Sequence, residues 1–177
     1  MSEENNITKL KIIIVGEPAV GKTSLVMRFV SNRFSKDYRS TIGTNIFMKN
    51  IELENGIIKL ALWDIAGQEK WLDMRHKYYR GAQGAIIVGD LTRKNTFNQI
   101  ENFWYKDLKK YLKSIPIILI GNKNDLESQV SELFIKDLEK QINAEASIIT
   151  SAKTGKNVDE AFTKLSKKII EYKKKKN

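Results

Sequence analysis

The segment Gly16–Thr23 has the residue types and the spacing of a phosphate-binding loop. It fits the pattern G-x-x-x-x-G-K-[ST] and lies between a β-branched apolar run and a helical pattern. Glycines let the backbone wrap closely around a phosphate, while successive N–H groups and a helix N-terminus direct positive dipoles at it. Lys22 adds a charge over the outer phosphates, and Thr23 offers a hydroxyl to Mg²⁺. The residues predicted to contact a nucleotide here are Gly16, Glu17, Pro18, Ala19, Val20, Gly21, Lys22, Thr23 and Ser24.

A second segment, Asn122–Asp125, indicates which base is bound. The Asp125 carboxylate accepts two adjacent hydrogen bonds, which guanine supplies from N1–H and its 2-amino group, whereas adenine presents an acceptor instead. Asn122 can tie this segment to the phosphate loop, and the Lys123 stem can cover one face of the base. A further loop, Ser151, Ala152 and Lys153, follows a strand and can offer a backbone N–H to the guanine O6.

A third segment carries the residues suited to hydrolysis. Asp64 ends an alternating strand and suits a Mg²⁺-holding role through water. Gly67 has no side chain, so its N–H can approach the γ-phosphate, and the Gln68 amide can orient the attacking water. Together the three segments predict that a guanosine triphosphate is bound and hydrolysed.

The elements that must position these loops can be read from the hydrophobic pattern. Buried strands are predicted over 9–15, 85–88, 115–120 and 146–150, because continuous β-branched runs are typical of a parallel sheet covered on both faces. Helices are predicted over 24–30, 96–112, 133–142 and 158–170, with Thr96 as the N-cap of the second and Asn157 opening the fourth. Each loop above therefore follows a predicted strand.

One pair of strands differs from the rest. Residues 46–54 and 57–63 alternate apolar and polar side chains on either side of Asn55-Gly56, the strongest short hairpin signal. The pattern therefore predicts a three-layer α/β sandwich with a mostly parallel six-stranded sheet, one antiparallel hairpin strand, and helices on both faces. We expect a flexible N-terminus over 1–8, one nucleotide-binding domain over 9–172, and a basic tail over 173–177.

Composition narrows the class of protein. The chain has 177 residues, 41% hydrophobic and 29% charged, which is ordinary for one globular domain and argues against global disorder. No apolar run approaches the roughly 18 residues of a membrane span. Cysteine is absent, which excludes disulfides, thiolate metal sites and cysteine-linked lipid on this chain. We therefore expect a cytoplasmic monomer.

The net charge of +10 is unevenly distributed and concentrates in the last helix and the tail. A solvated basic tail is one interpretation. Weak, salt-sensitive contact with anionic lipid, without a lipid anchor, is the other. Nucleic-acid binding is not expected, because the basic block lacks interleaved aromatic residues apart from Tyr172.

On these motifs the chain resembles small GTPases of the Ras superfamily, and the Rab branch most closely. The resemblance covers about residues 9–172 and rests on residues 40–43, 51–53, 63–69, 78–82 and 150–153 in addition to the phosphate loop. It implies a molecular switch for vesicle traffic with a slow intrinsic GTPase rate. It also implies effectors, exchange factors and GTPase-activating proteins that read switch loops at about 34–45 and 64–78.

The resemblance assigns further roles. Phe34 would flank the guanine, Tyr38 would close over the phosphates, and Thr41 would bind both Mg²⁺ and the γ-phosphate. Metal ligation would fall to Thr23 and Thr41, with Asp64 acting through water, and the catalytic set would be Gln68, Lys22, Thr41 and Gly67. An effector patch would be formed by Ile46, Trp63 and Tyr78.

Departures from the family pattern keep two alternatives open. Pro18 stands where glycine is frequent, and Ile65 replaces Thr or Ser, so one alternative is a binding module with negligible hydrolysis. The other is an ATP-using P-loop kinase, which Asn122 and Asp125 argue against. The absence of a terminal prenylation cysteine indicates either a truncated chain or a relative without a lipid anchor.

Overall fold

The computed structural model describes residues 7–37, 39–53, 56–68, 70 and 72–176. The elements along the chain are β1 (Ile7–Gly16), α1 (Lys22–Ser31), β2 (Thr44–Leu53), β3 (Gly56–Ile65), α2 (Leu72–Tyr79), β4 (Gly84–Asp90), α3 (Lys94–Gln99), the π-helical turn η2 (Ile100–Trp104), α4 (Tyr105–Tyr111), β5 (Ile117–Asn122), α5 (Glu132–Gln141), β6 (Ala146–Ile149) and α6 (Val158–Lys176). No helix in the described part of the chain is long and apolar enough to span a membrane.

The strands form one six-stranded sheet in the order β2-β3-β1-β4-β5-β6. Only the β2–β3 pair is antiparallel, in the register Ile46↔Trp63 and Ile51↔Ile58. All other neighbouring strands are parallel. This confirms the predicted fold, including the hairpin strand. The Asn55 turn residue itself lies outside the described residues.

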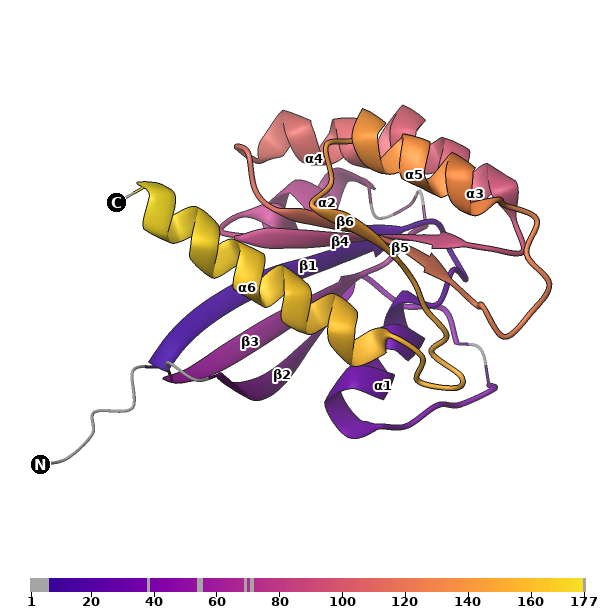
Figure 1. Ribbon diagram of the computed structural model, residues 1–177. Coiled ribbons are helices and arrows are strands. Elements are labelled where there is room, and N and C mark those ends of the chain that lie inside the picture. Colours follow the sequence, from indigo (N-terminus) through magenta and orange to yellow (C-terminus); the bar gives the residue numbers. More distant parts are fainter. Residues whose placement is uncertain (1–6, 38, 54–55, 69, 71, 177) are drawn as a thin grey trace, which may run out of the picture.

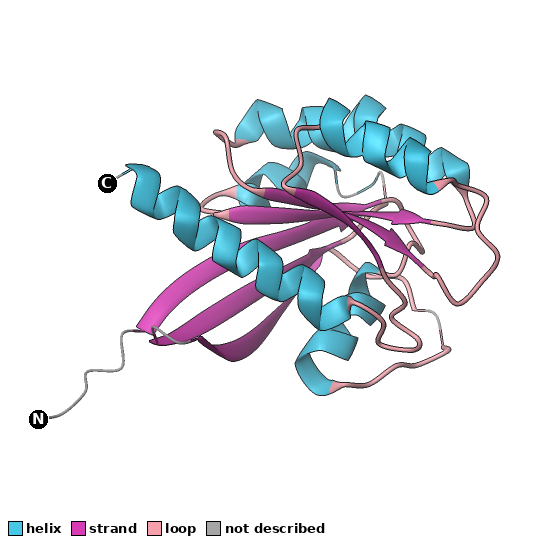
Figure 2. Ribbon diagram, in the orientation of Figure 1, coloured by secondary structure: helices cyan, strands magenta, loops and turns pink. Residues whose placement is uncertain are grey.

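Two apolar layers enclose the sheet (Figures 1 and 2). One packs α1 and α6 against the sheet, with Phe29 and Phe162 stacked at 4.3 Å between ring centroids. The other packs α2, α3, α4 and α5 against the opposite face around Phe97, Trp104 and Leu138. Strands β4 and β5 are buried throughout, as their apolar runs rich in isoleucine and valine predict.

Several predicted boundaries are corrected by the structure. β1 begins at Ile7, which pairs with Ile57 of β3, so Ile7 and Thr8 belong to the sheet and not to the expected flexible N-terminus. Helix α6 continues through Lys176, so the basic tail extends a helix, and its final lysines favourably face the negative end of the helix dipole.

The helix predicted over 96–112 is not regular. It begins at Lys94 with Arg93 at the N-cap, so Thr96 is not the expected cap. The Thr96 hydroxyl instead donates to the Arg93 carbonyl at 2.7 Å and accepts from the Asp90 N–H at 2.9 Å. It then passes through the π-helical turn at Ile100–Trp104, whose hydrogen bonds span one extra residue. This turn changes the angular position of the side chains that follow it.

Candidate functional site

The loops predicted to bind a nucleotide converge at the carboxyl edge of the sheet, where ligands bind in open α/β folds. They surround a cleft of about 980 Å³. The cleft gathers these predicted residues from distant parts of the chain: Pro18, Ala19, Gly21, Lys22, Thr23, Ser24, Phe34, Thr41, Gly67, Gln68, Asn122, Lys123, Asp125, Ala152 and Lys153. Gly16, Glu17, Val20, Asp64 and Ser151 are not among the lining residues. Tyr38 lies outside the described residues.

The carbonyls of the loop Gly16–Val20 are bound by side chains. Lys22 Nζ donates to the carbonyls of Gly16 and Glu17, each at 2.8 Å. Lys123 Nζ donates to Ala19 O at 2.8 Å, and Asn122 Nδ2 donates to Val20 O at 3.0 Å. Side chains from α1 and from the Asn122–Asp125 segment therefore fix the backbone conformation of this loop.

Close packing against Asn122 explains the second glycine of the motif. A Cβ atom on Gly21 would lie 2.3 Å from Asn122 Nδ2, and the residue has a φ of +100°. The Asn122 Oδ1 in turn accepts from Thr150 Oγ1 at 3.1 Å and from the Ala152 N–H at 3.2 Å. The Asn122 amide therefore ties its own segment, Asn122–Asp125, to the phosphate loop, as the sequence predicts. It also joins both to the Ser151–Lys153 loop.

Lys22 is a buried cation at the base of the cleft. Burial lowers its pKa to about 8, and the nearby carboxylates of Asp64 and Glu17 oppose this shift by favouring the charged form. A buried ammonium bonded only to carbonyls is costly, so an anion in the cleft would relieve an existing penalty. The geometry and the charge of Lys22 suit a phosphate.

Thr23, Thr41 and Asp64 bring hard oxygen atoms together beside the loop. Thr23 Oγ1 donates to Asp64 Oδ2 at 2.5 Å and lies 3.0 Å from Thr41 Oγ1. Asp64 is fully buried, its Oδ1 has no hydrogen-bond partner among the described residues, and burial raises its pKa. Hydroxyl and carboxylate oxygens are the ligands Mg²⁺ prefers, so this set fits a magnesium ion.

Asp125 lines the cleft from the loop that follows β5. Ser151 Oγ donates to its Oδ1 at 2.6 Å, and Lys153 Nζ lies 3.8 Å from its Oδ2. Arg28 of α1 holds the Ser151–Lys153 loop from behind by donating to Ala152 O at 2.8 Å and to Lys153 O at 2.5 Å. This support by Arg28 was not predicted, because nothing in a helix-surface arginine indicates a loop more than a hundred residues away.

The segment that follows β3 packs directly against the phosphate loop. A Cβ on Gly67 would lie 2.5 Å from Gly16 O and 2.7 Å from Pro18 N, so only glycine permits this approach. Gln68 lines the cleft, and its Nε2 donates to Ser40 Oγ at 2.7 Å. The two predicted switch segments are therefore joined by a direct hydrogen bond.

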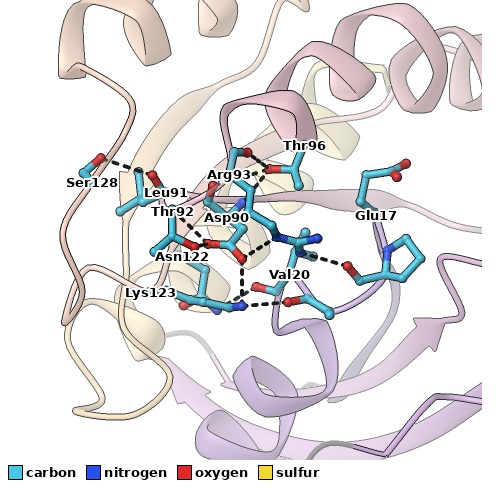
Figure 3. A network of polar contacts seen from close by, with 12 residues as sticks. Glu17, Val20, Asp90, Leu91, Thr92, Arg93, Thr96, Asn122, Lys123 and Ser128 are labelled. Carbon is cyan, nitrogen blue, oxygen red and sulfur yellow. Dashed lines mark hydrogen bonds and ion pairs between the residues drawn. The ribbon is translucent and has the colours of Figure 1, made fainter.

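A polar network behind the phosphate loop was missed by the sequence analysis (Figure 3). Asp90, at the end of β4, is fully buried and accepts from Lys123 Nζ at 2.7 Å, Arg93 Nε at 2.9 Å and Thr92 Oγ1 at 2.7 Å. Burial alone would raise the pKa of Asp90, but these hydrogen bonds together lower it. The sequence feature that could have identified Asp90 is a carboxylate at the end of a buried strand. In the sheet, Asp90 pairs with Asn122 in the register of β4 and β5.

The three residues of the predicted effector patch form a partly exposed surface. Ile46 is 51% exposed, and the rings of Trp63 and Tyr78 lie 6.3 Å apart. Lys11 Nζ lies 3.6 Å above the Trp63 ring, and the strand register places Lys9 and Lys59 on the same sheet face. The patch is therefore apolar at its centre and basic along β1 and β3.

Comparisons with known proteins agree with this geometry. The Ras family model matches residues 11–171. The chain is 44% identical over 169 residues to Ras-related protein Rab-1 of Theileria parva, covering 92% of this chain and 76% of that protein. It is 42% identical over 163 residues to Ras-related protein Rab-2B of Dictyostelium discoideum, covering 90% of this chain and 80% of that protein.

Proposed function

The chain belongs to the Ras family and is a small GTPase that acts as a molecular switch. We propose that the cleft at the carboxyl edge of the sheet binds GTP and GDP. The observation that carries this proposal is the convergence of the phosphate loop, the Asn122–Asp125 loop and the Ser151–Lys153 loop on one cleft of about 980 Å³. The charges in the lining support this binding mode: Lys22 offers a cation to the phosphates, and Asp125 offers a carboxylate to the base.

Asp125 selects guanine, because its two carboxylate oxygens accept from adjacent donors on that base. Phe34 and the Lys123 stem line the cleft and cover the base. The backbone N–H groups of the phosphate loop, together with Lys22, stabilise negative charge on the transferring phosphoryl group. Thr23 and Thr41 would hold Mg²⁺, with Asp64 behind them through water. When bound, the ion neutralises charge on the phosphate oxygens.

Gln68 orients the attacking water in this proposal. Its Nε2 donates to Ser40, which leaves the amide oxygen to accept a proton of the water. Thr41 and Gly67 respond together to the γ-phosphate, so its loss releases both switch segments. Effectors and regulators that read residues 34–45, 64–78 and the Ile46/Trp63/Tyr78 patch would then distinguish GTP from GDP.

Single-turnover phosphate release tests the catalytic assignment. We expect the Gln68→Leu variant to release phosphate at least about tenfold more slowly than the wild type, with GDP affinity unchanged. The matched control is Gln99→Leu at the end of α3, which loses an amide that does not line the cleft. Equal rates for wild type and Gln68→Leu would contradict the role of Gln68.

We also propose that the protein works in membrane traffic in the cytoplasm, because of its likeness to Rab proteins. We further propose that the basic end of α6 adds weak affinity for anionic membranes. Lys173, Lys174, Lys175 and Lys176 form the last turn of α6. Replacing these lysines by Gln should reduce sedimentation with phosphatidylserine vesicles at low salt and leave sedimentation with neutral vesicles unchanged. Unchanged binding to the anionic vesicles would refute the membrane contact.

A further inference from the structure

We infer that Arg93 is a positioning residue for the phosphates: it holds the peptide between Pro18 and Ala19 so that the Ala19 N–H faces the nucleotide. Arg93 precedes α3 and belongs to none of the nucleotide-binding segments recognised in the sequence. The inference rests on the proposed binding of nucleotide phosphates by the loop Gly16–Thr23.

The contact is direct and is anchored at both ends. Arg93 Nη2 donates to the Pro18 carbonyl at 2.9 Å, while its Nε donates to Asp90 Oδ2 at 2.9 Å (Figure 3). Asp90 is fully buried and is fixed independently by Lys123 and Thr92. The Arg93 side chain is 43% exposed, but its guanidinium is held by a rigid carboxylate. It therefore presents a fixed donor to the loop.

The contact also completes a series. Lys22 binds the carbonyls of Gly16 and Glu17, Lys123 binds that of Ala19, and Asn122 binds that of Val20. The Pro18 carbonyl lies between these, and Arg93 is its donor. Arg93 is not among the residues that line the cleft, so the Pro18 carbonyl is bound from outside it. Because the Pro18–Ala19 peptide is trans, the Ala19 N–H is directed the other way, toward the cleft that Ala19 lines.

Strain at Ala19 explains why the peptide between Pro18 and Ala19 needs a donor to hold its orientation. Ala19 has a φ of 61°, a left-handed conformation that is unfavourable for a residue with a Cβ. Rotation of the Pro18–Ala19 peptide would relieve that conformation, but it would also turn the Ala19 N–H away and direct the Pro18 carbonyl toward the phosphates. The hydrogen bond from Arg93 opposes this rotation.

A double-mutant cycle tests the inference on the full chain, with dissociation of fluorescently labelled GDP in the presence of Mg²⁺ as the readout. We expect Arg93→Ala to accelerate GDP dissociation about 10-fold to 100-fold, the effect of losing one hydrogen bond from a charged group. In the Ala19→Gly background the same substitution should accelerate it by less than about threefold, because glycine adopts a positive φ without strain. A purely structural role for Arg93 would give the same factor in both backgrounds.

The matched control is Lys94→Gln, which removes the same charge one residue along the chain. We expect its GDP dissociation rate to remain within about twofold of the wild type. Arg93→Lys provides a second variant if Arg93→Ala does not fold, because lysine retains the charge beside Asp90 but cannot donate to two acceptors in the same forked geometry. We expect it to behave like Arg93→Ala.

Two results would overturn the inference: GDP dissociation unaffected by both Arg93 substitutions, or equal acceleration in the Ala19 and Ala19→Gly backgrounds. Either result leaves the proposed function intact provided that the wild type binds GDP. Failure of the wild type to bind GDP would instead contradict the proposed function itself.

Discussion

The indole Nε1 of Trp104 donates a hydrogen bond to the Glu17 carboxylate at 2.9 Å. Trp104 is 1% exposed and is the last residue of the π-helical turn. The hydrogen bond holds the indole against the phosphate loop, and the centroid of the same ring lies 4.5 Å from the guanidinium carbon of Arg75 in α2. The turn therefore connects the phosphate loop to the helix of the second switch segment.

Replacing Trp104 by Phe removes the donor but retains an aromatic ring. We expect this change to lower the free energy of unfolding by about 1–3 kcal/mol, because a partly buried carboxylate loses its hydrogen bond. Urea unfolding of the GDP-bound protein measures the effect. Tyr105→Phe, which removes a polar atom from the next residue, is the control. If the two variants unfold at the same urea concentration, the Trp104 hydrogen bond does not contribute to stability.

The pKa of Lys22 predicts how nucleotide affinity depends on pH. Burial lowers this pKa from 10.5 to about 8 in the nucleotide-free protein, so Lys22 loses its proton as the pH rises through 8. Phosphates bind the protonated form, and GDP affinity should therefore decrease by up to about tenfold between pH 8 and pH 9. Equilibrium titration with labelled GDP at these pH values provides the measurement.

The stability of the nucleotide-free protein should change in the opposite direction. Between pH 8 and 10.5 the unfolded chain keeps a proton on Lys22 that the folded chain has released, so this group makes the free energy of unfolding rise with pH. Lys22→Arg is the control for both measurements, because arginine stays protonated throughout and also reveals any titration of the ligand itself. The same pH dependence in wild type and Lys22→Arg would exclude Lys22 as the titrating group.

The Gly67→Ala substitution tests the approach of the second switch segment to the phosphate loop. The added Cβ would lie 2.5–2.7 Å from the backbone of Gly16, Glu17 and Pro18, which cannot move aside as a flexible side chain could. We expect GTP hydrolysis to fall about tenfold or more and GDP affinity to remain within about threefold of the wild type.

Gly81→Ala is the matched control for this glycine. A Cβ there meets no atom of the described residues within 4 Å, but Gly81 has a φ of +78°. The substitution should therefore cost about 1 kcal/mol of stability and leave hydrolysis unchanged. Normal hydrolysis by the Gly67→Ala variant would show that close approach of Gly67 is not required.

The sheet and the cleft could be predicted because their signals are local. Buried strands such as Ile117–Asn122 contain apolar runs rich in isoleucine. The glycine, lysine and threonine positions of the phosphate loop are fixed relative to one another. The Asn122 amide and the Asp125 carboxylate could likewise be identified from chemistry and spacing.

The supporting contacts could not be predicted, because they join residues that no local pattern relates. The bonds from Arg93 to Pro18 and from Arg28 to Ala152 span 75 and 124 residues respectively. The π-helical turn is equally invisible, because Ile100, Phe103 and Trp104 fit the 3.6-residue spacing of an ordinary α-helix. The Ser131 hydroxyl that caps α5 by accepting from the Phe134 N–H was recognisable by type but was not identified.

The identity of the nucleotide released from the purified protein by denaturation tests the central claim most directly. Chromatography should find GDP or GTP in the wild type, and little nucleotide in Asp125→Ala, while the exposed-acid control Asp159→Ala retains it. Adenine nucleotide in the wild type, or equal guanine nucleotide in wild type and Asp125→Ala, would contradict the proposal that Asp125 and the phosphate loop hold opposite ends of one guanine nucleotide.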